Sequence, residues 1–120
     1  MTVQQAITHI DAVKPNVYTT ADKIAWLNTL DGKVKNDILD FYATEVDWDG
    51  YDAEHMSEEL LVPAPYDTIY EHYMAGEIDR LNEEIDLYNN DVALFNSDWS
   101  AFRNYYNRNN EHKRARVILI

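Results

Sequence analysis

Residues 67–107 decide the fold class, and they read DTIYEHYMAGEIDRLNEEIDLYNNDVALFNSDWSAFRNYYN. Apolar side chains recur there at alternating steps of three and four residues, a spacing that puts them on one face of an α-helix. The series is Ile78, Leu81, Ile85, Tyr88, Val92, Phe95, Trp99, Phe102 and Tyr106. The pattern predicts helix along the whole stretch and favours an all-α protein.

This spacing fits either one uninterrupted helix over 67–107 or two antiparallel helices. The polar cluster Asn82-Glu83-Glu84 suits a tight turn between helices. We therefore expect a helical hairpin, about 67–81 and 84–107, with Asp67 as the N-cap of its first helix. Periodicity by itself leaves both arrangements open.

Two further helices are expected before the hairpin. Thr2 and Gln5 have the spacing of a capping box, and the helix that they begin should stop before Pro15. Thr19 or Thr20 should cap a second helix, whose apolar positions run Ile24, Leu27, Leu30, Val34, Ile38 and Phe41. Gly32 lies inside it, but the apolar spacing keeps its phase across the glycine, so we expect a continuous helix.

Residues 43–66 have no sustained periodicity and predict a long acidic loop that leads into an extended strip, residues 60–66. Pro63 and Pro65 forbid a helix there. The strip should lie along the protein's own helices or along a neighbour, which makes Pro63, Pro65 and Tyr66 candidate partner-binding residues. Around Gly50 the loop resembles a calcium loop, but Met56 stands where a bidentate glutamate is required.

The net charge of −12 is distributed unevenly along the chain. Residues 45–98 hold 16 acidic residues and one base, Arg80, whereas residues 99–120 hold five bases and one acid. A nucleic-acid-binding protein would concentrate Lys and Arg on one surface, and an acidic surface repels phosphate. A solvated, solubilising face is the simplest interpretation of most of these carboxylates.

No pattern in the sequence indicates an enzyme. The chain has no cysteine, and we find no Gly-rich phosphate loop, no G-x-S-x-G motif and no pair of histidines at i, i+4. Paired carboxylates such as Glu58-Glu59 occur, without any sign of a pocket. We expect no catalytic residue, no metal and no cofactor, and the absence of an apolar run near 18 residues argues against a membrane span.

The C-terminal residues change in character. Residues 107–110 are rich in turn formers and should end the last helix, so we expect one helical domain over 1–108 and an extended C-terminal arm over 109–120. The arm combines basic and apolar residues, and its candidate partner-binding residues are Arg114, Arg116, Val117, Ile118, Leu119 and Ile120. Exposed apolar residues at a chain end need a cover. The arm should dock on another subunit, with packing on the chain's own helices as the alternative.

Two parts of the sequence resemble a family of short proteins encoded in the head-to-tail region of tailed phages that infect Gram-positive bacteria. The first lies within residues 2–40 and includes DAVKPN (11–16), KIAWLN (23–28) and LDGK (30–33). The second lies within 60–108 and includes LVPAPYD (61–67), YEHY (70–73), LFN (94–96) and YYNR (105–108). Related sequences often have Asn-Gly where this chain has Asn82-Glu83.

That family is similar to the adaptor proteins that form a ring, usually twelvefold, beneath the portal. The resemblance implies a structural virion protein in the neck between capsid and tail, present in the host cytoplasm during assembly. Its partners would be further copies of itself, the portal protein and the tail or next connector protein, while double-stranded DNA passes through without specific binding. Glu77, Glu84 and Asp91 are candidates for acidic residues that face such a channel.

Two other functions remain open. One is a tail-completion or assembly-chaperone protein of the same phage region, which would act transiently and be missing from the finished particle. The other is an acidic inhibitor or DNA-mimic module that binds a basic protein. It would require Glu77, Glu84 and Asp91 for binding, whereas an adaptor should be sensitive in the strip and the arm.

Overall fold

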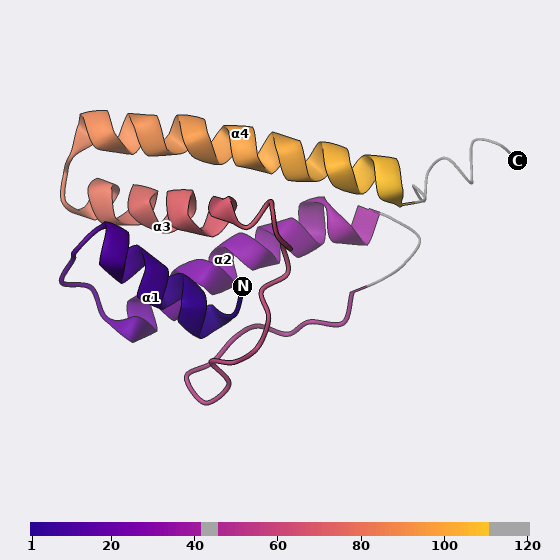
Figure 1. Ribbon diagram of the computed structural model, residues 1–120, viewed down its shortest axis with the longest axis horizontal. Helices are drawn as coiled ribbons and strands as arrows, with labels where there is room; N and C mark the ends of the chain where they lie inside the picture. Colours follow the sequence, from indigo (N-terminus) through magenta and orange to yellow (C-terminus); the bar gives the residue numbers. More distant parts are fainter. Residues whose placement is uncertain (42–45, 111–120) are drawn as a thin grey trace, which may run out of the picture.

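The computed structural model describes residues 1–41 and 46–110, and these form an all-α protein (Figure 1). The elements, in chain order, are α1 (Val3–Val13), α2 (Thr20–Asp37), a short 3-10 turn η1 (Leu39–Phe41), α3 (Thr68–Leu81) and α4 (Ile85–Asn109). Helix α3 packs against α1, α2 and α4, so it lies at the centre of the bundle. The all-α prediction is confirmed.

The beginning of α1 follows the sequence prediction closely. Thr2 is the N-cap, its hydroxyl accepts a hydrogen bond from the Gln5 amide, and the Gln5 side chain accepts one from the Thr2 amide. At the other end Lys14 is the C-cap, directly before Pro15. The local signals in this segment therefore set both ends of the helix.

Helix α2 is continuous through Gly32 but shorter than expected. Thr19 caps it, with its hydroxyl accepting from the Asp22 amide. The α-helix ends at Asp37, and the chain tightens into the η1 turn. Phe41, predicted to lie on the buried stripe, is 43% exposed, because the turn rotates it away from the line of the helix.

The predicted hairpin is present, and α3 and α4 run antiparallel along each other (Figure 1). At 25 residues against 14, α4 is the longer helix and reaches past the beginning of α3. Asp67 is the N-cap of α3, but its side chain makes no capping hydrogen bond. Leu81 and Ile85 were expected to be buried; they are 44% and 70% exposed because they flank the turn at the end of the hairpin.

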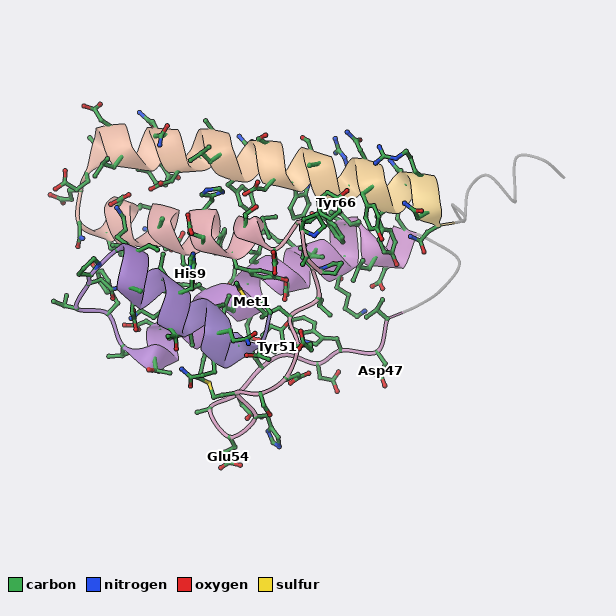
Figure 2. The ribbon with its side chains drawn as sticks, in the orientation of Figure 1. Met1, His9, Asp47, Tyr51, Glu54 and Tyr66 are labelled. Atoms are coloured by element: carbon green, nitrogen blue, oxygen red, sulfur yellow. The ribbon has the colours of Figure 1, made fainter. Side chains whose placement is uncertain are left out.

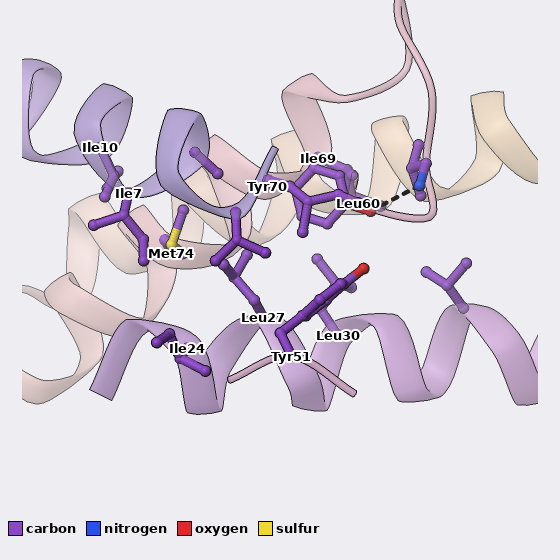
Figure 3. Packing of buried hydrophobic residues seen from close by; sticks show 14 of the residues in the cluster. Ile7, Ile10, Ile24, Leu27, Leu30, Tyr51, Leu60, Ile69, Tyr70 and Met74 are labelled. Carbon is purple, nitrogen blue, oxygen red and sulfur yellow. Dashed lines mark hydrogen bonds between the residues drawn. The ribbon is translucent and has the colours of Figure 1, made fainter. Parts of the chain in front are cut away.

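The core lies where α1, α2 and α3 meet (Figure 3). Its fully buried side chains include Ile10, Leu27, Leu30, Ile69, Tyr70 and Met74. Helix α4 adds only one large apolar side chain to the fully buried set, Phe102. Most of α4 is therefore held by one face only, and the other face is open.

The acidic loop and the strip run along the bundle without forming a helix in residues 46–66. Glu59 pairs with Thr2 in an isolated antiparallel bridge, in which the Val3 amide donates to the Glu58 carbonyl (3.0 Å) and the Leu60 amide to the Met1 carbonyl (2.9 Å). The N-terminus of the chain thus anchors the end of the loop, while the side chains of Asp47 and Glu54 point away from the helices (Figure 2).

Candidate interaction surfaces

The strip at residues 60–66 has a buried side and an exposed side. Leu60 and Val62 are buried in the core, whereas Pro63, Ala64 and Pro65 are exposed. The segment lies along the protein's own helices, one of the two expected positions, but it is not extended throughout. Residues 64–67 form a turn, in which the Tyr66 amide donates to the Pro63 carbonyl (2.9 Å). The prolines predicted to bind a partner form a ridge on the outer side of the segment. The Ala64–Pro65 peptide bond is cis.

A buried carboxyl group holds this ridge in place. Asp31 of α2 is fully buried and accepts hydrogen bonds from the hydroxyls of Tyr51 and Tyr70, the latter at 2.8 Å to Oδ1. The Leu61 amide also donates to Asp31 Oδ2 (3.2 Å), and the Val62 amide donates to the Tyr70 hydroxyl (2.8 Å; Figure 3). One carboxyl group therefore ties α2, the loop, the strip and α3 together.

Burial dominates the electrostatics of this network. It raises the pKa of Asp31 to about 6, against the opposing effect of its hydrogen bonds from Tyr51, Tyr70 and Leu61. Burial, followed by the charge of the nearby Asp31, also raises the pKa values of Tyr51 and Tyr70 far above the ordinary tyrosine value. Both tyrosines consequently remain protonated donors at any physiological pH.

A second attachment fixes the acidic loop to α2. The side chain of Asn28 accepts from the Tyr51 amide (2.7 Å) and donates to the Tyr51 carbonyl (3.1 Å), as a neighbouring β-strand would. Gly50 precedes this contact with a φ of +117°, and a Cβ there would lie 3.2 Å from Asn28 Oδ1. A glycine is needed at this position because of both its φ value and the close approach.

An open groove lies at the end of α4, and we call it the terminal groove. Its volume is about 440 Å³, within the range of roughly 300–1,000 Å³ typical of ligand pockets. Its apolar lining comes from η1, the loop, the strip and α4: Leu39, Val46, Leu61, Pro63, Phe102 and Tyr105. Tyr66, the third residue of the strip that was predicted to bind a partner, is half-buried beside the groove (Figure 2). The centroid of its ring lies 4.8 Å from that of Tyr105.

The three acidic residues predicted to face a channel do not share one exposed face. Glu84 is exposed at the hairpin turn, and Glu77 is half-buried and accepts a hydrogen bond from Arg80 (2.8 Å). Asp91 is only 9% exposed, so the expectation for it needs correction. The residue lies on the inner face of α4, three positions after Tyr88 and four before Phe95, and its carboxyl group points into the hairpin.

Asp91 belongs to a buried acidic pair with Asp79 of α3. Asp79 is 2% exposed and forms an ion pair with Lys14 at the end of α1 (3.1 Å). Burial, then the hydrogen bond and charge of Asp79, raise the pKa of Asp91 to about 7, against the weaker effect of Lys14. Asp91 can therefore carry the proton shared by the pair below neutral pH, as expected when two carboxyl groups lie in contact.

Two histidines, His9 and His72, join neighbouring helices. His9 of α1 pairs with Glu71 of α3, and His72 of α3 pairs with Asp98 of α4, which also accepts a hydrogen bond from Thr68 (3.2 Å). Within residues 1–41 and 46–110, no group of three or more His, Asp or Glu side chains could hold a metal ion. Nor is any helix in these ranges long and apolar enough to cross a membrane.

Sequence reasoning missed Asp31 and Asp79, although the helical spacing contained a signal. Asp31 follows Leu27 by four residues and precedes Val34 by three, which places it on the buried stripe. An acidic residue in that register must either be exposed by a bend or find donors in the core. The arm residues Arg114, Arg116, Val117, Ile118, Leu119 and Ile120 lie outside the described part of the chain.

Comparisons of the chain with protein-family models, with curated protein sequences and with solved structures give no significant match.

Proposed function

We propose that the chain is a structural protein of a tailed bacteriophage, an adaptor subunit of the head-to-tail connector. In this proposal copies form a ring beneath the portal, in the neck between capsid and tail, extend the channel for double-stranded DNA and join the tail. The resemblance of residues 2–40 and 60–108 to phage head-to-tail proteins is the starting point. The structure contributes an observation of its own.

The observation that carries the proposal is that different contact surfaces lie on one small body. The Pro63–Pro65 ridge is exposed and held by the Asp31 network, and the terminal groove lies beside it. The outer face of α4 also exposes Leu87 and Leu94, 49% and 40% exposed, which are spaced seven residues apart and so lie on one side of the helix. In a ring of identical subunits, each contact joins one surface of a subunit to a different surface of its neighbour, so each subunit needs two different surfaces.

The charge of the chain suits a channel through which DNA slides. The net charge is −12, and carboxylates such as Glu54 and Glu84 are exposed. Such a surface repels the phosphate backbone and does not hold it. An inhibitor or DNA mimic would need an acidic face, and of the three residues suggested for it only Glu84 is fully exposed, so the structure favours this alternative less.

In vitro complementation tests the proposal. Capsids filled with DNA would be purified from an infection that lacks this chain, mixed with tails and with the purified protein, and the tailed particles counted. We expect the full chain and the control Val17→Asp, changed at an exposed residue between α1 and α2, to restore joining. The double charge reversal Arg114→Glu, Arg116→Glu should not. Joining without any added chain would contradict the proposal.

A further inference from the structure

The terminal groove is open, has more apolar than polar surface, and lies at the end of α4. Asn109 and Asn110 stand at its edge, directly after α4. Leu61 and Pro63 line it from the strip, and Phe102 lines it from α4. A largely apolar hollow beside the end of α4 is suited to an apolar segment of similar width.

The chain itself contains such a segment. Val117, Ile118, Leu119 and Ile120 are four consecutive apolar residues, preceded by Lys113, Arg114 and Arg116. Residues 1–110 hold all but one of the 22 acidic residues and only seven of the ten basic ones. Asp47, next to the groove residue Val46, is exposed at this end of the molecule, and so are Arg103 and Arg108 of α4. The apolar residues of the arm therefore match the apolar lining of the groove, while the acidic excess of residues 1–110 as a whole attracts its basic residues.

The connection between α4 and the apolar segment favours docking on another copy. Asn110, the turn former that follows α4, has an extended backbone (φ −135°, ψ 146°) and does not reverse the chain. Residues 111–116, EHKRAR, include no Gly, Pro, Asn, Asp or Ser, the residues with which chains usually reverse direction. An arm docking in its own groove would have to turn back beside the helix end that forms the groove's edge. Six residues reach at most about 20 Å when extended, so the apolar segment can lie well beyond the end of α4.

We propose that residues 117–120 of one copy dock in the terminal groove of a neighbouring copy, whose net negative charge attracts the basic residues 113–116. The inference deepens the proposed function and rests on it in one respect, namely that several copies lie side by side. Each copy would give an arm and receive one. This is a head-to-tail contact, which closes into a ring when the rotation between subunits allows it.

The absence of cysteine from the chain permits a clean crosslinking test. One sample of the full chain would carry Pro63→Cys at the edge of the groove, and a second would carry Ile118→Cys in the arm. After mixing and mild oxidation, we expect the mixed disulfide dimer to form several times more than in the control. The control pairs Ile118→Cys with Val17→Cys, an 89% exposed position outside the groove lining. Circular dichroism would show that each variant is folded.

Two outcomes would overturn the inference. One is a chain carrying both Pro63→Cys and Ile118→Cys that crosslinks only within itself at every concentration, because its own arm would then occupy the groove. The other is a mixed dimer no more abundant than in the Val17→Cys control. Crosslinking between copies of a chain that is missing from phage particles would instead keep this inference and remove the phage function.

Discussion

Asp31 connects four segments of the protein through one buried side chain. Its two oxygens accept hydrogen bonds from Tyr51, Tyr70 and the Leu61 amide. Burying a carboxyl group is unfavourable unless donors surround it, and here three donors come from the loop, the strip and α3. The exposed Pro63–Pro65 ridge thus depends on a residue in the core.

The substitution Asp31→Asn should destabilise the protein at pH 5 by about 1–3 kcal/mol, because an amide NH₂ cannot accept a hydrogen bond from the surrounding donors, whereas the hydroxyl oxygen of the protonated carboxyl group can. Burial raises the pKa of Asp31 to about 6, so the folded protein keeps this proton above pH 4 while the unfolded chain releases it. The proton on Asp31 therefore stabilises the folded protein most at low pH, and this stabilisation is lost as the pH rises through 6.

Asparagine does not titrate, so the loss of unfolding free energy caused by Asp31→Asn should be smaller at pH 8 than at pH 5, by roughly 1 kcal/mol. Urea unfolding of both proteins at the two pH values measures the change. An equal loss at pH 5 and pH 8 would contradict the raised pKa.

Asp91→Asn should show the same direction of pH dependence as Asp31→Asn, but for a different physical reason. Asp91 holds a proton against Asp79 in the folded protein, and burial and Asp79 raise its pKa to about 7. Its contribution to stability is therefore lost as the pH rises from about 4 to about 7. An asparagine keeps a donor for Asp79 at every pH, so the variant should gain stability relative to the parent between pH 5 and pH 8.

Thermal unfolding of Asp91→Asn at the two pH values tests this, with Asp86→Asn, at an exposed position in the first turn of α4, as the matched control. If the difference in Tm between Asp91→Asn and the parent is the same at pH 5 and pH 8, the acidic pair does not share a proton.

The turn between α3 and α4 shows how the elements are joined without glycine. The Glu84 amide donates to the Asp79 carbonyl (2.9 Å) and the Glu83 amide to the Arg80 carbonyl (3.2 Å), which is the hydrogen-bond pattern of a Schellman motif. Glu83 occupies the left-handed position with a φ of 60°. This conformation costs a residue with a Cβ about 1–2 kcal/mol, a cost that glycine avoids.

We therefore expect Glu83→Gly to stabilise the protein by about 1 kcal/mol, measured by urea unfolding. The matched control is Glu84→Gly, one position later, where no positive φ exists to be relieved. No gain from Glu83→Gly, or the same effect from both substitutions, would show that the turn stores no strain at Glu83.

The sequence predicted the helices well because their signals are local. The capping box of Thr2 and Gln5 and the three-and-four spacing of residues 78–106 are each confirmed by an element of the structure. The choice between a hairpin and one long helix was not local. Both give the same spacing, and the decision depends on α4 packing back along α3. A helix continued straight through residues 82–84 would lose that packing.

The candidate surfaces were harder to predict than the helices. The exposed ridge at Pro63 and Pro65 follows from proline chemistry, but Asp91 was expected on the surface and lies inside the hairpin. Acidic residues are normally exposed, which favoured a surface position for Asp91. The helical spacing, in contrast, places Asp91 on the inner face of α4. The terminal groove is lined by residues of η1, the loop, the strip and α4, which lie far apart in the sequence. No local sequence pattern predicts that these segments come together.

At the scale of the whole molecule, the bundle is elongated, with extents of 54 × 34 × 21 Å. The long α4 covers α3 on one side and is open on the other (Figure 1). The groove lies at the same end of α4 as the beginning of the arm, and the hairpin turn lies at the opposite end. In the proposed ring, a subunit of this shape would offer separate places for a neighbour and for the components above and below it.

Counting the copies of this chain in finished phage particles tests the proposed function most directly. Quantitative mass spectrometry of purified particles, with the major capsid protein as the internal standard, gives the number per particle. We predict one fixed number, twelve for a ring that matches a twelvefold portal, in particles and in isolated necks. A chain that is needed for assembly but absent from finished particles would contradict the adaptor function and indicate a transient assembly factor.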